Sequence, residues 1–430
     1  MIATLIGFVA LFALFFVGIP LAIGLGLVGF VGFGMLVGFP ASAAMTAQIA
    51  WDTVSSYSLA VLPMFVLMGN LVNHAGLSRE LYSASNAFVG HRRGGLAMAT
   101  IIACGGFAAV CGSSIATAAT MSKIALPSMR RFGYSEALAV GSIASGGTLG
   151  IIIPPSVPMV IYASLTEQSV GKMFIAGIMP GILGIVFYLM AVKAHTLMDP
   201  KAGPAGPRIP WGERLALARS VWPTAGLFML VIGGIYLGVF TAEEAAGIGA
   251  AGALFIALTR RLLTVPSLVT ILAETARTTA MLMAVLIGAL IFSNFIGTTG
   301  ISGQIVNQIK ALNLPPLGVM LVIVALYVVL GCVLESLSMI LLTIPVIYPL
   351  VIGLGYDPIW FGILVVVLIE ISLITPPIGV NLFVIQAISG SSALTLYRGV
   401  LPFIVADIVR LAVILLLPAV ILFLPNHMMK

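Results

Sequence analysis

The chain has 430 residues, of which 61% are hydrophobic. Its 19 Lys and Arg and 13 Asp and Glu give a charged share of 7%, about a quarter of the share in soluble globular proteins. This composition excludes a soluble globular fold. The formal net charge of +6 is spread over few positions, and no basic tract interleaved with aromatic residues suggests nucleic-acid binding.

Long uncharged runs indicate membrane spans, because a helix of roughly 20 apolar residues crosses about 30 Å of hydrocarbon. No charge precedes Asp52. This first stretch lacks the basic start of a signal peptide, so it is interpreted as two retained spans joined near Gly18 to Pro20. The three cysteines lie in apolar runs, which excludes a disulfide framework and a zinc spacing and predicts small membrane side chains: Cys104, Cys111 and Cys332.

The first half predicts five spans, an amphipathic stretch and one interrupted apolar segment. In chain order they are spans 2–18, 20–39 and 57–73, amphipathic 77–92, interrupted segment 94–131, broken span 136–163 and span 170–193. The interruption falls at Cys111-Gly-Ser-Ser114, and the break at 146–150 and Pro154-Pro155. A polar, Pro- and Gly-rich linker follows from Asp199 to Arg208.

The second half repeats this order. It predicts spans 220–239, 243–260 and 277–296, amphipathic 302–313, interrupted segment 316–352, broken span 358–387 and span 398–424. Turn residues recur at a displacement of 222, as in Pro127 and Pro349 or Pro180 and Pro402. So many coincidences indicate an internal duplication.

We therefore expect an all-α integral membrane fold of two inverted-topology repeats, each with five spans, a re-entrant helical hairpin and an amphipathic arm helix. The repeats are 1–195 (hairpin 94–131, broken span 136–163) and 220–430 (hairpin 316–352, broken span 358–387), joined by a cytoplasmic linker at 196–219. If the hairpins were instead full double crossings, the parity would be the same. Because each half crosses the membrane five times, an odd number, the second repeat has the opposite orientation in the membrane.

The positive charges support this topology, because short cytoplasmic loops hold most Lys and Arg. With the N-terminus outside, in the periplasm, the outer side receives little beyond Lys172, Lys310 and Lys430. The inner side receives the larger set: Arg79, Arg92, Arg93, Arg130, Arg131, Lys193, Lys201, Arg208, Arg214, Arg219, Arg260, Arg261 and Arg398.

The breaks carry the chemistry, because non-helical backbone at membrane depth needs protein or a water-filled cavity to receive its polar groups. A hairpin tip and a broken span in each half form the pattern of a secondary transporter with its site at the repeat interface. Helix N-termini favour an anion, and freed carbonyls and hydroxyls can bind a cation such as Na+. The structural alternative is that the small residues only permit close helix packing.

Four ionisable residues of the second half lie inside apolar runs: Glu335, Glu370, Asp407 and Arg410. Glu335 falls opposite Ser113 at the common displacement, and Glu370 falls opposite Thr148. Either glutamate is a ligand, a proton carrier or a cap of backbone amides at the break. Asp407 and Arg410 lie one turn apart, so they form a structural ion pair or contact the substrate or a partner subunit.

No soluble catalytic signature is present: the sequence has neither a P-loop nor an HExxH motif. We therefore expect no enzyme activity and no cofactor. Energy must then come from an ion gradient or another subunit.

Four motifs in order resemble the large membrane subunit of tripartite ATP-independent periplasmic (TRAP) transporters, the DctM-like family. They are Cys111-Gly-Ser-Ser-Ile-Ala-Thr117, Gly146-Gly-Thr-Leu-Gly-Ile-Ile-Ile-Pro-Pro-Ser156, Leu334-Glu-Ser336 with Thr343-Ile-Pro345, and Ile374-Thr-Pro-Pro-Ile-Gly-Val-Asn-Leu-Phe383. The resemblance covers essentially the whole chain. It implies an elevator-type importer of organic acids such as dicarboxylates or sialic acids, coupled to a Na+ gradient in a bacterial inner membrane. It also implies a separate small four-span (DctQ-like) subunit and a periplasmic (DctP-like) binding protein.

The resemblance further implies the site residues. One Na+ is expected at Gly112, Ser113, Ser114, Gly147 and Gly150, and a second at Glu335, Ser336, Thr375, Pro376 and Gly379. The substrate carboxylate is expected near Ser114, Ser156, Ser336 and Asn381. Two other hypotheses stay open: a proton-coupled transporter that uses Glu335 and Glu370, and an intramembrane enzyme or passive scaffold subunit.

Overall fold

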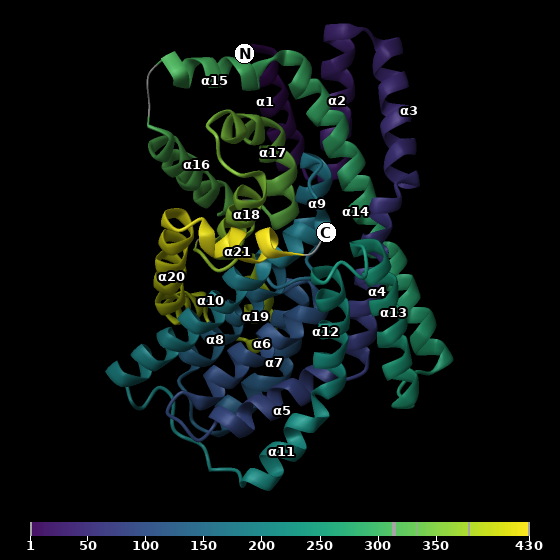
Figure 1. Ribbon diagram of the computed structural model, residues 1–430. Helices are drawn as coiled ribbons and strands as arrows, with labels where there is room; N and C mark the ends of the chain where they lie inside the picture. The colour runs from purple at the N-terminus through teal and green to yellow at the C-terminus, as the bar shows by residue number, and fades with distance from the viewer. Residues whose placement is uncertain (1, 312–314, 333, 377–378, 429–430) are drawn as a thin grey trace.

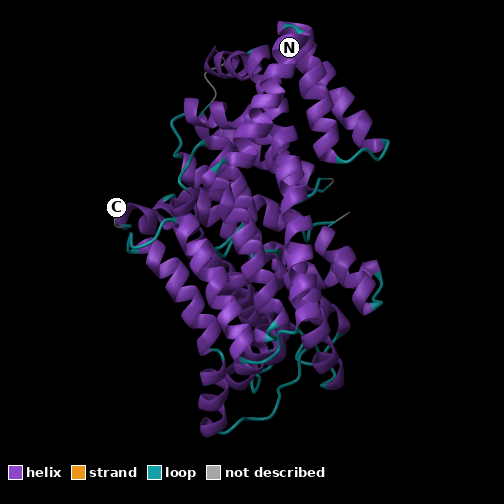
Figure 2. Ribbon diagram, turned by 90° about the vertical axis from the view of Figure 1, so that its right-hand side faces the viewer, coloured by secondary structure: helices purple, strands orange, loops and turns teal. Residues whose placement is uncertain are grey.

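The computed structural model describes residues 2–311, 315–332, 334–376 and 379–428, and these residues form helices and connecting segments without a strand (Figure 2). Parts of three predicted elements lie outside the described residues. They are 312 and 313 of the second amphipathic stretch, 333 of the second hairpin, and Pro377 with Ile378 of the second break.

Helices of the first half follow the predicted order, with one addition. They are α1 (Ile2–Phe16), α2 (Leu21–Val37), α3 (Phe39–Ser55), the short 3-10 helix η1 (Tyr57–Ala60), α4 (Val61–His74), α5 (Leu77–Val89), α6 (Gly95–Cys111), α7 (Ser114–Arg131), α8 (Glu136–Thr148), η2 (Leu149–Ile151), α9 (Val157–Thr166) and α10 (Val170–Met198). The predicted amphipathic stretch is α5, the interrupted segment is α6 and α7, and the broken span is α8, η2 and α9.

The second half shows the same succession. Its helices are α11 (Trp211–Ser220), α12 (Trp222–Tyr236), α13 (Ala242–Thr259), α14 (Val265–Thr299), α15 (Ile301–Ala311), α16 (Pro316–Gly331), α17 (Ser336–Gly353), α18 (Pro358–Ser372), α19 (Val380–Ser389), α20 (Ala393–Leu416) and α21 (Ala419–His427). In Figure 1 the amphipathic helix α15 lies at the top of the molecule, whereas α5 lies near the bottom.

Two helices were not predicted, and the predicted span 398–424 is wrong because it is divided into α20 and α21 at Leu417 and Pro418. Helix α3 occupies 39–55, which the sequence left unassigned because Thr46, Gln48 and Asp52 interrupt its apolar pattern. Helix α11 begins inside the predicted linker 196–219 and meets α12 at an angle of 47°. The predicted span 277–296 is also too short, because α14 runs through 35 residues without a break.

Six helices of the described part are long and apolar enough to cross a membrane, or seven if α11 and α12 count as one bent span. Of the α-helices in both hairpins and both broken spans, only α17 is among these six. Helix α7 has 18 residues but is too polar, and the others have 10–17 residues. Large hydrophobic side chains are exposed along most of the helices, as expected for surfaces that face lipid. The ten predicted crossings remain a prediction.

The core centres on two helices that are buried on every side. Every residue of α8 from Leu138 to Thr148 is buried, and so is every residue of α18 from Ile359 to Ser372. Helix α8 packs against α20 at a crossing of two glycines, where a Cβ on Gly141 would collide with the carbonyl of Gly399. The close approach of these backbones joins the first half to the second.

The first broken span ends at a strained residue. Glu167 follows α9 with a φ of 55°, in the left-handed region that costs a residue other than glycine about 1–2 kcal/mol. The corresponding residue after α19 is Gly390, with a φ of 70°. Since Glu167 is exposed, its side chain offers little packing to offset the strain.

We expect Glu167→Gly to raise the free energy of unfolding by about 0.5–1 kcal/mol, because it removes this strain. Unfolding by SDS titration in detergent micelles measures the change. Gly390→Ala is the matched control and should lower the same quantity. A decrease for Glu167→Gly would contradict the strain argument.

Candidate functional site

The first hairpin tip is a turn between two helix ends. Gly112 ends α6 in the left-handed conformation, with a φ of 65°. Ser113 begins α7 as its N-cap, and its hydroxyl accepts a hydrogen bond from the Ala116 amide at 3.3 Å. Ser114 is the first residue of α7 and is buried. The tip therefore presents a helix N-terminus and hydroxyl-bearing residues inside the protein.

The first break packs directly against this tip. A Cβ on Gly150 would lie 2.7 Å from the Ser113 carbonyl oxygen, and a Cβ on Gly147 would lie 2.8 Å from the Ala118 Cβ. On the other side, a Cβ on Gly112 would lie 2.6 Å from the Pro155 carbonyl oxygen. Glycine is required for all three approaches. The structure thus brings together the residues predicted for the first cation.

Ser156 follows the break at the start of α9. It is buried, and its hydroxyl donates to the Ile151 carbonyl at 2.5 Å. With Gly112 and Pro155 it lines a small cavity of about 20 Å³. The predicted substrate residues Ser114 and Ser156 thus flank one tip, but Ser156 already uses its proton within the break.

The second hairpin tip differs in charge. Glu335 takes the N-cap position of α17 and is exposed, whereas Ser336 is half-buried. At the second break the Thr375 hydroxyl donates to the Ile371 carbonyl at 2.7 Å, and Gly379 has a φ of 52°. Cys332 links the tip to the break, because its Sγ lies 3.6 Å from the Pro376 carbonyl oxygen. The sequence predicts Cys332 only as a small membrane side chain and gives no sign of this contact.

Asn381 lies where the two halves meet. It is fully buried, its backbone amide donates to the Leu373 carbonyl at 3.2 Å, and its Nδ2 donates to the Ala144 carbonyl of α8 at 3.5 Å. Its Oδ1 has no hydrogen-bond partner among the described residues. An unpaired buried acceptor costs about 1–3 kcal/mol, so this amide oxygen suits a donor or cation supplied by a ligand.

Five polar side chains form a buried network beside the two breaks: Thr148, Tyr188, Glu370, Asp407 and Arg410. The Arg410 Nη2 lies 2.8 Å from both Glu370 Oε2 and Asp407 Oδ1, and only the contact with Glu370 has the alignment of a hydrogen bond. The predicted pairing of Asp407 with Arg410 is therefore confirmed. The participation of Glu370 and Tyr188 in this pairing was not predicted from the sequence.

Threonine and tyrosine complete this network. The Thr148 hydroxyl shares its proton between the Ser145 carbonyl of its own helix, at 2.7 Å, and Glu370 Oε1, at 3.1 Å. The Tyr188 hydroxyl lies 3.2 Å from Thr148 Oγ1 and donates to Asp407 Oδ2 at 2.8 Å. Side chains, rather than backbone amides of the break, thus hold the Glu370 carboxylate. A Cβ on Gly184 would collide with Arg410, so the guanidinium fits only beside this glycine.

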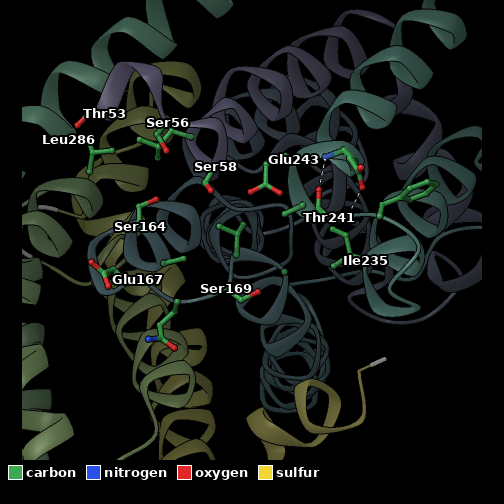
Figure 3. Close-up of a pocket in the computed structure, with 18 of the residues that line it drawn as sticks. Thr53, Ser56, Ser58, Ser164, Glu167, Ser169, Ile235, Thr241, Glu243 and Leu286 are labelled. Atoms are coloured by element: carbon green, nitrogen blue, oxygen red, sulfur yellow. Dashed lines mark hydrogen bonds between the residues drawn. The ribbon is translucent and has the colours of Figure 1, made fainter. Parts of the chain in front are cut away.

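A cavity of about 930 Å³ lies away from these residues (Figure 3). Figure 3 shows Ser58, Ser169, Thr241 and Glu243 around it, and none of the predicted site residues lines it. Its lining contains four carboxylates and no Lys or Arg: Asp52, Glu167, Glu243 and Glu244. The candidate site is instead tightly packed, so solute access requires the packed elements to move.

The all-helical fold, its apolar helices and its paired helix breaks define a multi-pass membrane transporter subunit. A family model described as "Tripartite ATP-independent periplasmic transporter, DctM component" matches residues 8–420. The chain belongs to this family, the large permease component of TRAP transporters, and it is not an enzyme.

Two curated relatives and one solved structure illustrate the similarity. The C4-dicarboxylate TRAP transporter large permease protein DctM of Pseudomonas aeruginosa is 40% identical over 391 residues, 90% of each chain. The sialic acid TRAP transporter large permease protein SiaM of Vibrio cholerae is 30% identical and covers 88% of this chain and 89% of its own. The crystal structure of the Alcanivorax borkumensis YdaH transporter shares the fold at 14% identity, with a TM-score of 0.64 over 88% of this chain and 89% of that one.

Proposed function

We propose that this permease imports an organic acid across the bacterial inner membrane by an elevator movement coupled to a Na+ gradient. A DctQ-like small membrane subunit completes the membrane part, and a DctP-like periplasmic protein delivers the substrate. The family name describes a tripartite transporter, and the two relatives are named for C4-dicarboxylates and for sialic acid, which are both carboxylates.

The observation that carries this proposal is the contact of each hairpin tip with the break of its own half. In the first half Gly150 lies against the Ser113 carbonyl, and in the second half Cys332 lies against the Pro376 carbonyl. Backbone carbonyls and hydroxyls at non-helical turns are the hard oxygen ligands that Na+ prefers. We place one Na+ at each contact: at Gly112, Ser113, Ser114, Gly147 and Gly150, and at Glu335, Ser336, Thr375, Pro376 and Gly379.

The substrate carboxylate lies between the two tips in this proposal. The N-termini of α7 and α17 begin at Ser114 and Ser336, and helix N-termini attract anions. Ser156 and Asn381 complete the site from the two breaks. The unpaired Asn381 Oδ1 supports a ligand at this position, because it can accept a hydrogen bond or coordinate a cation there.

Inverted repeats at 1–195 and 220–430 explain how the two sites face each other. The arm helices α5 and α15 at opposite heights in Figure 1 support the inversion. The bond between Thr148 and Glu370 joins residues 222 positions apart, the displacement of the repeat. Such a contact is expected near a pseudo-two-fold axis, where equivalent positions approach each other. The N-terminus lies in the periplasm on this arrangement.

Removal of Na+ tests the coupling. We expect proteoliposomes that contain both membrane subunits, with substrate-loaded binding protein outside, to lose uptake when choline replaces Na+, because the tips then lack the cations that organise them. A protonophore at constant Na+ should leave uptake in place. Radiolabelled C4-dicarboxylates and sialic acid are the first substrates to measure.

A second function, proton coupling through Glu335 and Glu370, is favoured by one observation. Two carboxylates, those of Glu370 and Asp407, share a single guanidinium at positions without solvent exposure. If uptake persists in choline and is abolished by the protonophore, the coupling ion is the proton and not Na+.

A further inference from the structure

The buried network repeats one motif twice. Thr148 and Tyr188 of the first half correspond to Glu370 and Arg410 of the second, each displaced by 222. Within each half the two equivalent side chains pair: Thr148 Oγ1 lies 3.2 Å from the Tyr188 hydroxyl, and Glu370 Oε2 lies 2.8 Å from Arg410 Nη2. A broken helix (α8 or α18) thus pairs with the long helix that follows its break (α10 or α20).

The network also links the halves to each other. Thr148 Oγ1 donates to Glu370 Oε1 at 3.1 Å, and the Tyr188 hydroxyl donates to Asp407 Oδ2 at 2.8 Å. The Arg410 guanidinium carbon lies 5.7 Å from the centre of the Tyr188 ring, within the range of a cation–π contact. Every member is buried, so each bond lies in a medium of low dielectric, where it is strong and directional.

Both ends of the Thr148–Glu370 bond lie close to a break. Gly150, which contacts the first tip, is two residues from Thr148, and Gly147, which contacts Ala118 of α7, is one residue from it. Glu370 lies in the last turn of α18, five residues before Thr375 and six before Pro376, and Pro376 contacts the second tip through Cys332. A change in the position of one break therefore acts on the other break through this bond.

We propose that Thr148, Glu370 and Arg410 are positioning residues that couple the two breaks, so that binding of a cation at one break raises the affinity for a cation at the other. This inference rests on the proposed function, because it needs Na+ at both breaks. When the first break moves, Thr148 moves with it and shifts Glu370 through their hydrogen bond. Arg410 holds the Glu370 carboxylate in the orientation that bonds to Thr148. The two cation sites are thus coupled through protein side chains and not through direct contact between the ions.

The test is the Na+ dependence of uptake by Thr148→Val in the reconstituted tripartite system. Valine keeps the shape of threonine and removes the hydroxyl, and with it both the bond to Glu370 and the bond to the Ser145 carbonyl of the same helix. We expect the Hill coefficient for Na+ to fall to about one and the half-saturating Na+ concentration to rise at least about fivefold, the lower end of typical coupling between sites. Thr148→Ser, which restores the hydroxyl, should return both values to those of the unmodified protein.

Thr100→Val is the matched control. Thr100 is also fully buried in a helix of the first half, and its hydroxyl donates to the Leu96 carbonyl of its own helix at 2.8 Å. This variant should keep the Na+ dependence of the unmodified protein. Tyr188→Phe, which removes a bridging hydroxyl without changing the packed ring, gives a second variant and should also lower the Hill coefficient.

The outcomes separate the inference from the proposed function. If the unmodified protein transports without Na+, both fall. If it requires Na+ and Thr148→Val keeps its Hill coefficient and half-saturating concentration, only the coupling is overturned. The same holds if Thr148→Ser fails to restore these values, or if Thr100→Val changes them as much as Thr148→Val does.

Discussion

Gly150→Ala is expected to lower Na+-driven uptake by about a hundredfold while the protein still inserts and folds. The added Cβ would lie 2.7 Å from the Ser113 carbonyl oxygen, 2.8 Å from the Ser113 carbonyl carbon and 2.9 Å from the Ser114 nitrogen. All three atoms belong to backbone, so the tip and the break must move apart. Overpacking of this kind costs about 1–3 kcal/mol of stability, and ligand oxygens displaced by several tenths of an ångström no longer fit the ion.

The measurement compares uptake with the amount of folded protein in the membrane fraction. Gly233→Ala, in the apolar helix α12, is the matched control, because a Cβ there meets no atom within 4 Å. Its uptake should remain within about twofold of the unmodified rate. Gly147→Val, which crowds Ala118, should reproduce the loss. Normal uptake by Gly150→Ala would show that the first break is not part of the transport site.

Arg410→Met is expected to lower the free energy of unfolding by about 3–5 kcal/mol. The change leaves the Glu370 and Asp407 carboxylates without a positive partner at positions with no solvent exposure, and an uncompensated buried charge is among the most destabilising single defects. Detergent-solubilised protein and an SDS titration give the free energy.

Two comparisons isolate the buried charge as the cause. Arg130 pairs with Glu136 where the side chains are 45% and 34% exposed, so Arg130→Met should cost no more than about 1 kcal/mol. The triple variant Glu370→Gln, Asp407→Asn, Arg410→Met removes all three charges and should recover part of the loss. Equal costs for Arg410→Met and Arg130→Met would show that the buried network contributes nothing beyond a surface pair.

The sequence predicts the helices best where composition and turn residues agree. Long apolar runs place α10 and α20, and the Gly- and Pro-rich breaks separate α8 from α9, because these residues cannot continue a regular helix at low cost. Helix α3 escapes prediction for the opposite reason. Its polar residues interrupt the apolar pattern that indicates a helix. The equivalent segment of the second repeat is the first part of α14, which continues without a break into the following span.

The site divides along a similar line. Gly112, Ser113, Gly147 and Gly150 could be grouped from sequence, because tip and break in one repeat follow each other closely in the chain. The pairing of Glu370 with Arg410 and Thr148 joins elements 40 and 222 residues apart, and no local pattern predicts it. The repeat did place Glu370 opposite Thr148, so the signal was present. Its use would have required knowing that equivalent positions meet at the axis.

The contact of Thr148 with Glu370 has an evolutionary consequence. If two identical halves met as a symmetric homodimer, this position would place the same side chain against itself. Two glutamates would repel each other, and two threonines would leave an arginine at the position of Tyr188 and Arg410 without the carboxylate that Glu370 supplies. Fusion of the two halves in one gene allows each copy to mutate separately, so the charged network could arise only after the ancestral symmetry was broken.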